Sequence, residues 1–312
     1  MKTIDFKQGV IALAPLAGYT DFPFRSIVKK LGVDLTFSEM ISANALVHNS
    51  KKTFKMLKKS PLETPYIVQI AGSDLIVIRD AIEILNDIEG IDGVDLNCGC
   101  PVPKVISQHS GSSLLLDLPH MGKIVELIKK YSNKQYTSLK VRLGYSSKIP
   151  EEIAKEVKNS GADFMSVHGR TRNGAYKAPV DYEAIARIRQ NINIPVLANG
   201  DITNYIKAME VKKITGCNSL MIGRGAIGNP WIFYQLKHGR DLVDNALKAK
   251  IILEHFDSMI EFYGSYGVGM FRKHLHAYSK KHEEASSFRN RINMIVDIDE
   301  AREEIMKFFN SH

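Results

Sequence analysis

The stretch Gly93-Val94-Asp95-Leu96-Asn97-Cys98-Gly99-Cys100-Pro101-Val102-Pro103-Lys104 joins a short apolar run of β character to an abrupt turn. The Gly and Pro residues around Cys100 force the backbone out of the strand and into a loop. Free cysteine is among the most buried residue types, so two cysteines here could simply fill space near a strand end. A thiol raised onto a loop at the end of a buried strand is also well placed to meet a substrate.

Further runs of β character lie on both sides of Gly93–Asn97, and most are followed by an amphipathic helical pattern. The other strand candidates are Val10–Ala14, Asp34–Phe37, Tyr66–Ile70, Ser138–Leu143, Phe164–His168, Pro195–Ala198 and Ser219–Ile222. The helix candidates include Pro23–Leu31, Leu75–Asp87, Pro119–Tyr131, Ile149–Ser160, Asp181–Asn191 and Asn204–Thr215, with a less clear one near Ser42–Leu57. Apolar strands that alternate with helices predict a parallel sheet buried on both faces. Eight such units in about 230 residues favour a (β/α)8 TIM barrel, with an open α/β sheet as the alternative.

Polar groups and turns lie at the carboxyl ends of the predicted strands, one strand after another. In a TIM barrel the carboxyl ends of all strands face one mouth, where the active sites of this fold lie. Any single member of the set could be a satisfied cap, but together they predict a functional site. They are Pro15-Leu16-Ala17-Gly18, Glu39, Gln69, Asn97 with Cys100, Lys140 with Arg142, His168 with Arg170, Asn199-Gly200-Asp201 and Gly223-Arg224-Gly225.

The last two members of that set are glycine-containing turns that could each lead into a helix. Successive backbone N–H groups in front of a helix N-terminus bind anions, and Arg224 adds a positive charge. The loops after strands seven and eight of this barrel often bind phosphate. The paired turns therefore predict a phosphate site.

Composition and charge narrow the class of protein. The 312 residues are 44% apolar and 24% charged, as in an ordinary globular protein, and contain no apolar run long enough to span a membrane. The first residues lack a signal-peptide pattern and the cysteines are few, so we expect a reducing, cytoplasmic location. We expect no metal site, because Cys98 and Cys100 have no second ligand pair at zinc-like spacing. A net charge of +8 favours a polyanionic partner such as nucleic acid, although a lysine-rich proteome also produces basic proteins.

The alternation of strands and helices stops after Trp231-Ile232-Phe233, and helical periodicity continues from about Asp241. This predicts a barrel over residues 1–240 and a small all-helical domain over residues 241–312. Interleaved basic and aromatic residues suit phosphates and unstacked bases, although nearby acidic residues also fit a solvated helix face. The basic and aromatic members are Arg272, Lys273, His274, His276, Tyr278, Lys280, Lys281, His282, Phe288, Arg289 and Arg291.

Several motifs, in order along nearly the whole chain, make it resemble the tRNA-dihydrouridine synthases, particularly the bacterial subgroup labelled B. The most specific is Asn97-Cys-Gly-Cys-Pro101 followed by Lys104. The others are Ala14-Pro-Leu-Ala-Gly-Tyr-Thr-Asp-Phe-Pro-Phe-Arg25, Ser38-Glu-Met40, Val68-Gln-Ile-Ala-Gly72, Lys140-Val-Arg142, Val167-His-Gly-Arg-Thr-Arg172, Ala198-Asn-Gly-Asp-Ile202, Met221-Ile-Gly-Arg224, Asn229-Pro-Trp231 and Arg272-Lys-His274.

The resemblance implies an FMN-containing barrel with a helical domain that reduces the C5–C6 double bond of uridine in tRNA with NADPH or NADH. It implies that Cys100 is the acid, and that Asn97 and Arg172 contact the uracil. Arg272 and Lys273 would contact the RNA, and Cys98 and Cys217 would be structural. It assigns the flavin ring and its polar edge to Pro15, Leu16, Ala17, Gln69, Lys140 and His168, and the FMN phosphate to Asn199, Gly200, Asp201, Gly223 and Arg224.

The implied chemistry requires a hydride at C6 of the uracil and a proton at C5. Cys100 would deliver that proton as a general acid, and an ordinary cysteine is a thiol at neutral pH because its pKa is about 8.5. Lys140 would stabilise the anionic reduced flavin. Three alternatives stay open: the same chemistry on rRNA, an FMN barrel dehydrogenase acting on a small pyrimidine, and a non-catalytic RNA-binding protein. We expect a monomer that needs no protein partner.

Overall fold

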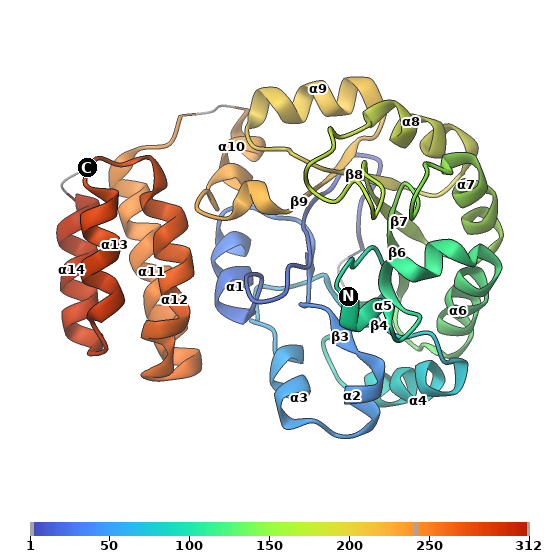
Figure 1. Ribbon diagram of the computed structural model, residues 1–312, viewed down its shortest axis with the longest axis horizontal. Coiled ribbons are helices and arrows are strands. Elements are labelled where there is room, and N and C mark those ends of the chain that lie inside the picture. The colour runs from blue at the N-terminus through green and yellow to red at the C-terminus, as the bar shows by residue number, and fades with distance from the viewer. Residues whose placement is uncertain (1–2, 240–241, 311–312) are drawn as a thin grey trace.

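The computed structural model describes residues 3–239 and 242–310, and within them the chain forms a closed barrel with a group of helices beside it (Figure 1). The nine-stranded sheet is parallel throughout and runs in the order β1-β9-β8-β7-β6-β5-β4-β2, with β3 also on β4. The bridge between Ala12 and Leu35 joins β1 to β2 and closes the ring. This is the predicted (β/α)8 barrel, and the open sheet is excluded. The strands are β1 (Ile11–Leu13), β2 (Thr36–Phe37), β3 (Ile41–Ser42), β4 (Tyr66–Ala71), β5 (Gly93–Cys98), β6 (Tyr136–Arg142), β7 (Phe164–His168), β8 (Val196–Asn199) and β9 (Ser219–Ile222).

The second strand of the barrel is interrupted, which the sequence did not indicate. Both β2 and β3 pair with β4, and residues 38–40 between them belong to neither strand. The Ser38 hydroxyl accepts the backbone N–H of Gln69 at 2.9 Å, and the Glu39 carboxylate accepts that of Gly18 at 2.6 Å. The interruption therefore ties the loop after β1 to the end of β4.

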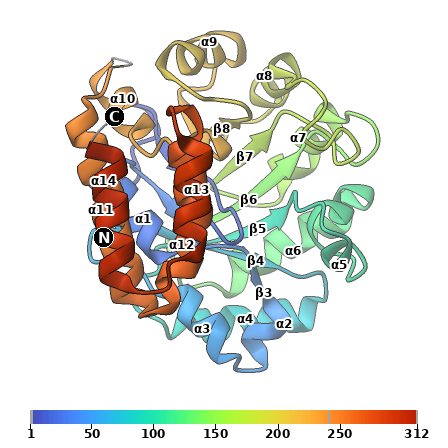
Figure 2. The ribbon, with the colours of Figure 1, turned by 60° about the vertical axis from the view of Figure 1, so that its left-hand side comes forward.

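Helices surround the barrel in the predicted alternation (Figures 1 and 2). The unclear helix near Ser42–Leu57 is two short helices, and the side chains of Ser42 and Ser50 cap their N-termini. The outer helices are α1 (Phe22–Lys30), α2 (Ala43–Val47), α3 (Lys51–Leu57), α4 (Leu75–Asn86), α6 (Leu118–Tyr131), α7 (Pro150–Asn159), α8 (Tyr182–Asn191), α9 (Tyr205–Thr215) and α10 (Ile232–His238). Three short elements lie in loops after strands: α5 (Pro103–Ile106), η1 (Gly111–Leu116) and η2 (Arg224–Ala226).

The core of the barrel follows the alternation of the strands. On β1, Ala12 belongs to a buried apolar cluster inside the ring, and Leu13 belongs to the larger cluster between strands and helices. Phe37, Phe164 and Met221 fill the interior from other strands. This packing closes the lower part of the ring and leaves the polar strand ends at the mouth.

The C-terminal helices form a bundle with its own apolar core, which lies against α1 (Figures 1 and 2). They are α11 (Asn245–Tyr263), α12 (Tyr266–Tyr278), η3 (Ser279–Lys281), α13 (Ala285–Met294) and α14 (Ile298–Asn310). Phe262 of α11 stacks on Phe22 of α1 with ring centroids 4.7 Å apart, and Tyr263 donates a hydrogen bond to Asp21 at 3.1 Å. The expected boundary between residues 240 and 241 falls outside the described residues.

Candidate active site

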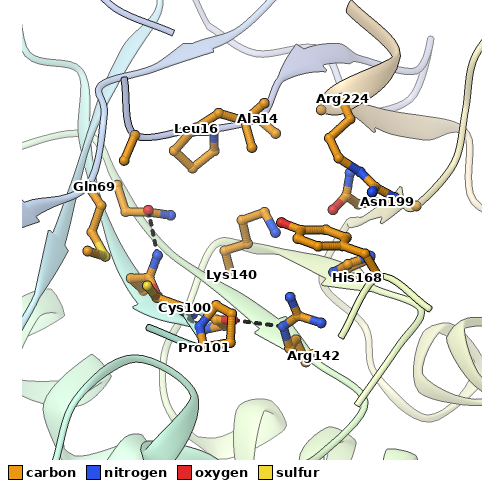
Figure 3. Close-up of a pocket in the computed structure, with 18 of the residues that line it drawn as sticks. Ala14, Leu16, Gln69, Cys100, Pro101, Lys140, Arg142, His168, Asn199 and Arg224 are labelled. Carbon is orange, nitrogen blue, oxygen red and sulfur yellow. Dashed lines mark hydrogen bonds between the residues drawn. The ribbon is translucent and has the colours of Figure 1, made fainter. Parts of the chain in front are cut away.

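A cavity of about 450 Å³ opens at the carboxyl ends of the strands (Figure 3). It brings together residues from most of the strands, which the sequence places far apart. Every residue predicted to hold the flavin lines it, together with the predicted acid: Pro15, Leu16, Ala17, Gln69, Cys100, Lys140, His168, Asn199, Gly200, Asp201, Gly223 and Arg224. Asn97 lines it as well.

At one end of the cavity, Arg224 shares the carboxylate of Asp201 with Arg170, which is buried and does not line the cavity. Arg170 and Arg224 both donate to Asp201, and the Arg224 contact is 2.8 Å. These arginines hold the pKa of Asp201 below its usual range. The carboxylate therefore orients the guanidinium groups, and a bound anion would meet Arg224 and the backbone of Asp201 rather than the Asp201 side chain.

The backbone of this end also requires glycine. At Gly200 φ is +137°, and a Cβ there would lie 2.9 Å from a methyl group of Val180. A Cβ on Gly225 would overlap the carbonyl oxygen of Ile202. The glycines therefore allow these turns to pack closely against Val180 and Ile202.

The helices expected directly behind these turns are absent there, within the described residues. Gly223 leads into η2, a single 3₁₀ turn, and α9 begins only at Tyr205 with Asn204 as its cap. The expected helix N-terminus is therefore missing behind Gly223, where a short 3₁₀ turn contributes little dipole, whereas α9 follows the turn at residues 199–201 after a short gap. An anion at this end would depend mainly on Arg224 and on the backbone of the turns.

The floor of the cavity has an excess of positive charge. Burial lowers the pKa of Lys140 to about 8, which still leaves the ammonium protonated at neutral pH. The pKa of His168 is lowered to about 2, so its imidazole is neutral. The main cause is burial, followed by the positive charges of Lys140, Arg142, Arg170 and Arg224. Figure 3 shows Lys140 between the side that holds Cys100 and the side that holds Arg224.

The thiol side is built from the loop after β5. The backbone N–H of Cys100 donates to the side-chain oxygen of Asn97 at 2.9 Å, and its carbonyl accepts the N–H of Ser112 at 3.0 Å. Gly111 is needed beside it, because a Cβ there would lie 2.9 Å from that carbonyl oxygen and φ is +64°. Cys100 is half-buried, whereas Cys98 and Cys217 are buried, so the predicted difference between the cysteines is seen.

Two residues at the mouth were given no role by the sequence. The guanidinium of Arg142 donates to the carbonyl oxygens of Gly99 at 2.8 Å and Thr171 at 3.1 Å, which joins the thiol loop to the loop after β7. Tyr176 lines the cavity with its ring 3.9 Å from the Arg224 guanidinium carbon. Arg142 follows a strand and its position could be predicted, but no sequence signal distinguishes Tyr176 from other loop tyrosines.

Three predicted contact residues do not line the cavity. Arg172 stacks over the ring of Tyr145, with 5.1 Å from the guanidinium carbon to the ring centroid. Arg272 donates to the carbonyl oxygen of Ile295 at 2.8 Å within the bundle. Lys273 lies nearer the mouth, with its ammonium 5.3 Å from the ring centroid of Tyr19. Contact with a substrate stays a prediction for all three.

The aromatic part of the expected RNA surface is wrong for three of its members. His274, Tyr278 and Phe288 are buried, and the two larger rings belong to the apolar core of the bundle. A buried ring cannot stack on a base. These residues hold the helices together instead.

A parallel barrel whose mouth combines anion-binding turns, buried cations and a half-buried thiol has the architecture of an enzyme that binds a phosphate-bearing molecule. The dihydrouridine synthase family model matches residues 12–312 of the chain. A protein of Helicobacter pylori (strain ATCC 700392 / 26695) described as a probable tRNA-dihydrouridine synthase is 50% identical over 309 residues, which covers 98% of this chain and 94% of the relative. The tRNA-dihydrouridine synthase B of Proteus vulgaris is 36% identical, covering 97% and 96%. The chain belongs to the dihydrouridine synthase family of enzymes, as its motifs predicted.

Solved structures of low sequence identity share the fold. The structure of TcOYE with pHBA has a TM-score of 0.56 at 7% identity, covering 82% of this chain and 94% of that one. Morphinone reductase has a TM-score of 0.53 at 10% identity, covering 76% and 87%. The described residues contain no helix with the length and apolarity needed to cross a bilayer, and no cluster of His, Cys, Asp and Glu suited to a metal ion.

Proposed function

We propose that this enzyme reduces the C5–C6 double bond of uridines in tRNA to 5,6-dihydrouridine, with FMN in the mouth cavity and NADPH or NADH as the reductant. The observation that carries the proposal is the single cavity that gathers the motif residues from separate strands. Membership of the dihydrouridine synthase family supports the product.

The residues of the cavity fit FMN in size and charge. Its volume of about 450 Å³ is within the usual range for a small-molecule pocket. Arg224 and the glycine turns would hold the phosphate, because a cation and glycine-containing main chain line the same end of the cavity. Lys140, Gln69 and the neutral His168 would meet the polar edge of the ring system, and the main chain around Leu16 would lie beside it.

Cys100 is the proton donor in this proposal. When bound, FMN supplies hydride transfer, from the nicotinamide to C6 of the uracil. The thiol of Cys100 gives its proton to C5 and regains one from water, which completes the addition of H₂ across the double bond. Lys140 places a positive charge beside the electron-rich ring system, and in a buried site that charge acts with little screening.

The RNA would be held by the basic surface around the mouth. A base inside folded tRNA has to leave its stack to reach Cys100, at a cost of a few kcal/mol. Lys273 on α12 and Arg172 after β7 are the contacts that we propose, the first because it reaches the loop after β1. The net charge of +8 supports salt-sensitive binding, with one monomer on one tRNA.

The decisive test is nucleoside mass spectrometry after the purified protein is incubated with FMN, NADPH and unmodified tRNA. Parallel reactions contain unmodified rRNA, free uracil or dihydroorotate. Dihydrouridine in tRNA supports the proposal, whereas product only in rRNA would change the substrate and keep the chemistry. Turnover of a free pyrimidine without product in RNA would overturn it in favour of a small-molecule dehydrogenase, and bound flavin with no product in any reaction would overturn the activity.

A further inference from the structure

A carboxylate lies fully buried in the middle of β5, next to the candidate site but outside its lining. Asp95 accepts hydrogen bonds from the Ser138 hydroxyl at 2.6 Å and from the Gln69 side-chain nitrogen at 2.7 Å. Burying a carboxylate is costly unless its oxygens are paired. Burial raises the pKa of Asp95 to about 6, and its two hydrogen bonds act against that rise, so the group is mainly ionised at neutral pH.

The pairing of Asp95 determines how two carboxamides are oriented. An ionised carboxylate only accepts hydrogen bonds, so Gln69 has to present its NH₂ group to Asp95. Its oxygen then faces Asn97 and accepts from the Asn97 side-chain nitrogen at 2.7 Å. The oxygen of Asn97 is consequently left for the backbone, where it accepts from Gly99 at 3.1 Å and Cys100 at 2.9 Å.

The chain of contacts has a consistent direction from one end to the other. Backbone N–H groups can only donate and the carboxylate can only accept, so both ends enforce the same orientation of the amides. Reversing Gln69 would bring its oxygen against the carboxylate and its NH₂ group against that of Asn97. Buried polar chains of this kind rigidify a site when each member is satisfied.

We propose that Asp95 is a positioning residue for the active-site thiol: through Gln69 and Asn97 it fixes the backbone that carries Cys100. Asp95 itself does not touch the cavity. The inference rests on the proposed role of Cys100 as the acid, and its test includes a measurement that needs neither RNA nor turnover.

The test measures the rate at which iodoacetamide alkylates Cys100 in the native, flavin-loaded protein, read by peptide mass spectrometry. Cys98 and Cys217 are buried and provide internal controls for unfolding. The variant Asp95→Leu replaces both carboxylate oxygens with methyl groups. Asp95→Ala removes both acceptors without adding bulk. Ser138→Ala is the matched control, because it removes one partner of Asp95 and leaves the link to Gln69.

We expect Cys100 to be alkylated about threefold faster in Asp95→Leu than in wild type, because the loop that carries Cys100 becomes locally more mobile. The kcat of Asp95→Leu for dihydrouridine formation should fall roughly 10–100-fold with little change in KM for tRNA, since the acid is misplaced. Ser138→Ala should stay close to wild type in both measurements. A folded Asp95→Leu that alkylates at the wild-type rate would overturn the inference.

If Asp95→Leu does not fold, Asp95→Ala decides. Alkylation at Cys100 faster than in Ser138→Ala supports the positioning role, and an equal rate refutes it. Absence of dihydrouridine with the wild-type protein would refute the proposed function alone, because the alkylation rates still report on the link between Asp95 and the thiol loop.

Discussion

The barrel mouth and the helical bundle differ in how well the sequence predicts the positions of their side chains. At the mouth, most of the polar residues at the ends of separate strands line one cavity, and of the polar side chains in that predicted set only Glu39 and Arg170 lie outside its lining. In the bundle, the basic and aromatic residues expected on one RNA-binding surface divide into different environments. Tyr278 and Phe288 are core, Arg272 bonds to a backbone carbonyl, and Lys273 reaches toward the mouth.

Topology explains the difference between the two regions. In a parallel barrel the carboxyl ends of all strands face the same mouth, so a polar residue at such an end lies at or near that mouth. On a helix, a shift of a single position moves a side chain by about 100° around the axis, so neighbours in sequence can face core and solvent. Residue type at a strand end is therefore a stronger functional signal than the same residue type on a helix.

The largest effect should come from Cys100 at the mouth. Cys100→Ala should lower the rate of dihydrouridine formation by roughly 10²–10⁴-fold, because the proton donor is lost. FMN content should be unchanged. The matched control is Cys98→Ala, which alters a buried thiol two residues away. Full activity in Cys100→Ala would remove Cys100 as the acid.

In the bundle, the core assignment of Phe288 predicts an effect on stability rather than on binding. Phe288→Ala should reduce the free energy of unfolding by about 3–5 kcal/mol, since a fully buried ring is removed. Tyr266→Ala on α12 is the control, because that side chain is 83% exposed and should change stability by less than about 0.5 kcal/mol. Normal unfolding of Phe288→Ala with lost tRNA binding would show instead that the ring contacts RNA.

At the phosphate end of the mouth, Arg224→Gln should weaken FMN binding about 10–100-fold, which corresponds to a lost charge-assisted hydrogen bond. Flavin fluorescence titration measures the affinity. Arg187→Gln is the control, because Arg187 pairs with Glu151 on the outer helices. Equal affinities for the two variants would place the phosphate elsewhere.

The junction between bundle and barrel should weaken in acid. Burial lowers the pKa of His274 to about 3 and holds that of His255 below its usual range, so both imidazoles are neutral when folded. The unfolded chain takes up their protons below about pH 6.5, so stability falls as the pH drops from there toward 3, by roughly 1.4 kcal/mol per pH unit for each histidine. Asp21 and Asp95, with raised pKa values near 6, act in the opposite direction.

These opposing groups partly cancel in the total pH dependence, so the contribution of His274 has to be isolated by comparing wild type with His274→Gln. The quantity measured is hydrogen exchange along α12 as a function of pH. Wild type should lose protection below about pH 6.5 more steeply than the variant. Parallel profiles would show that His274 does not contribute to the pH dependence.

The sequence predicted the barrel and the cavity lining because both follow from strand order. It did not predict the break between β2 and β3, where the Ser38 hydroxyl accepts from the backbone N–H of Gln69 on a neighbouring strand. Asp95 was missed as well, although a carboxylate within an otherwise apolar strand is a visible signal for a buried partner. The position of Tyr176 depends on the path of a loop, and local sequence does not determine it.

The central claim is that one cavity joins the flavin to the uridine. The most direct measurement reduces the bound flavin without oxygen, adds unmodified tRNA, and counts dihydrouridine formed against flavin reoxidised. We expect one dihydrouridine for each flavin in the wild type, and very slow reoxidation by tRNA in Cys100→Ala. Flavin that stays reduced in the presence of tRNA, or is reoxidised without dihydrouridine, would contradict it.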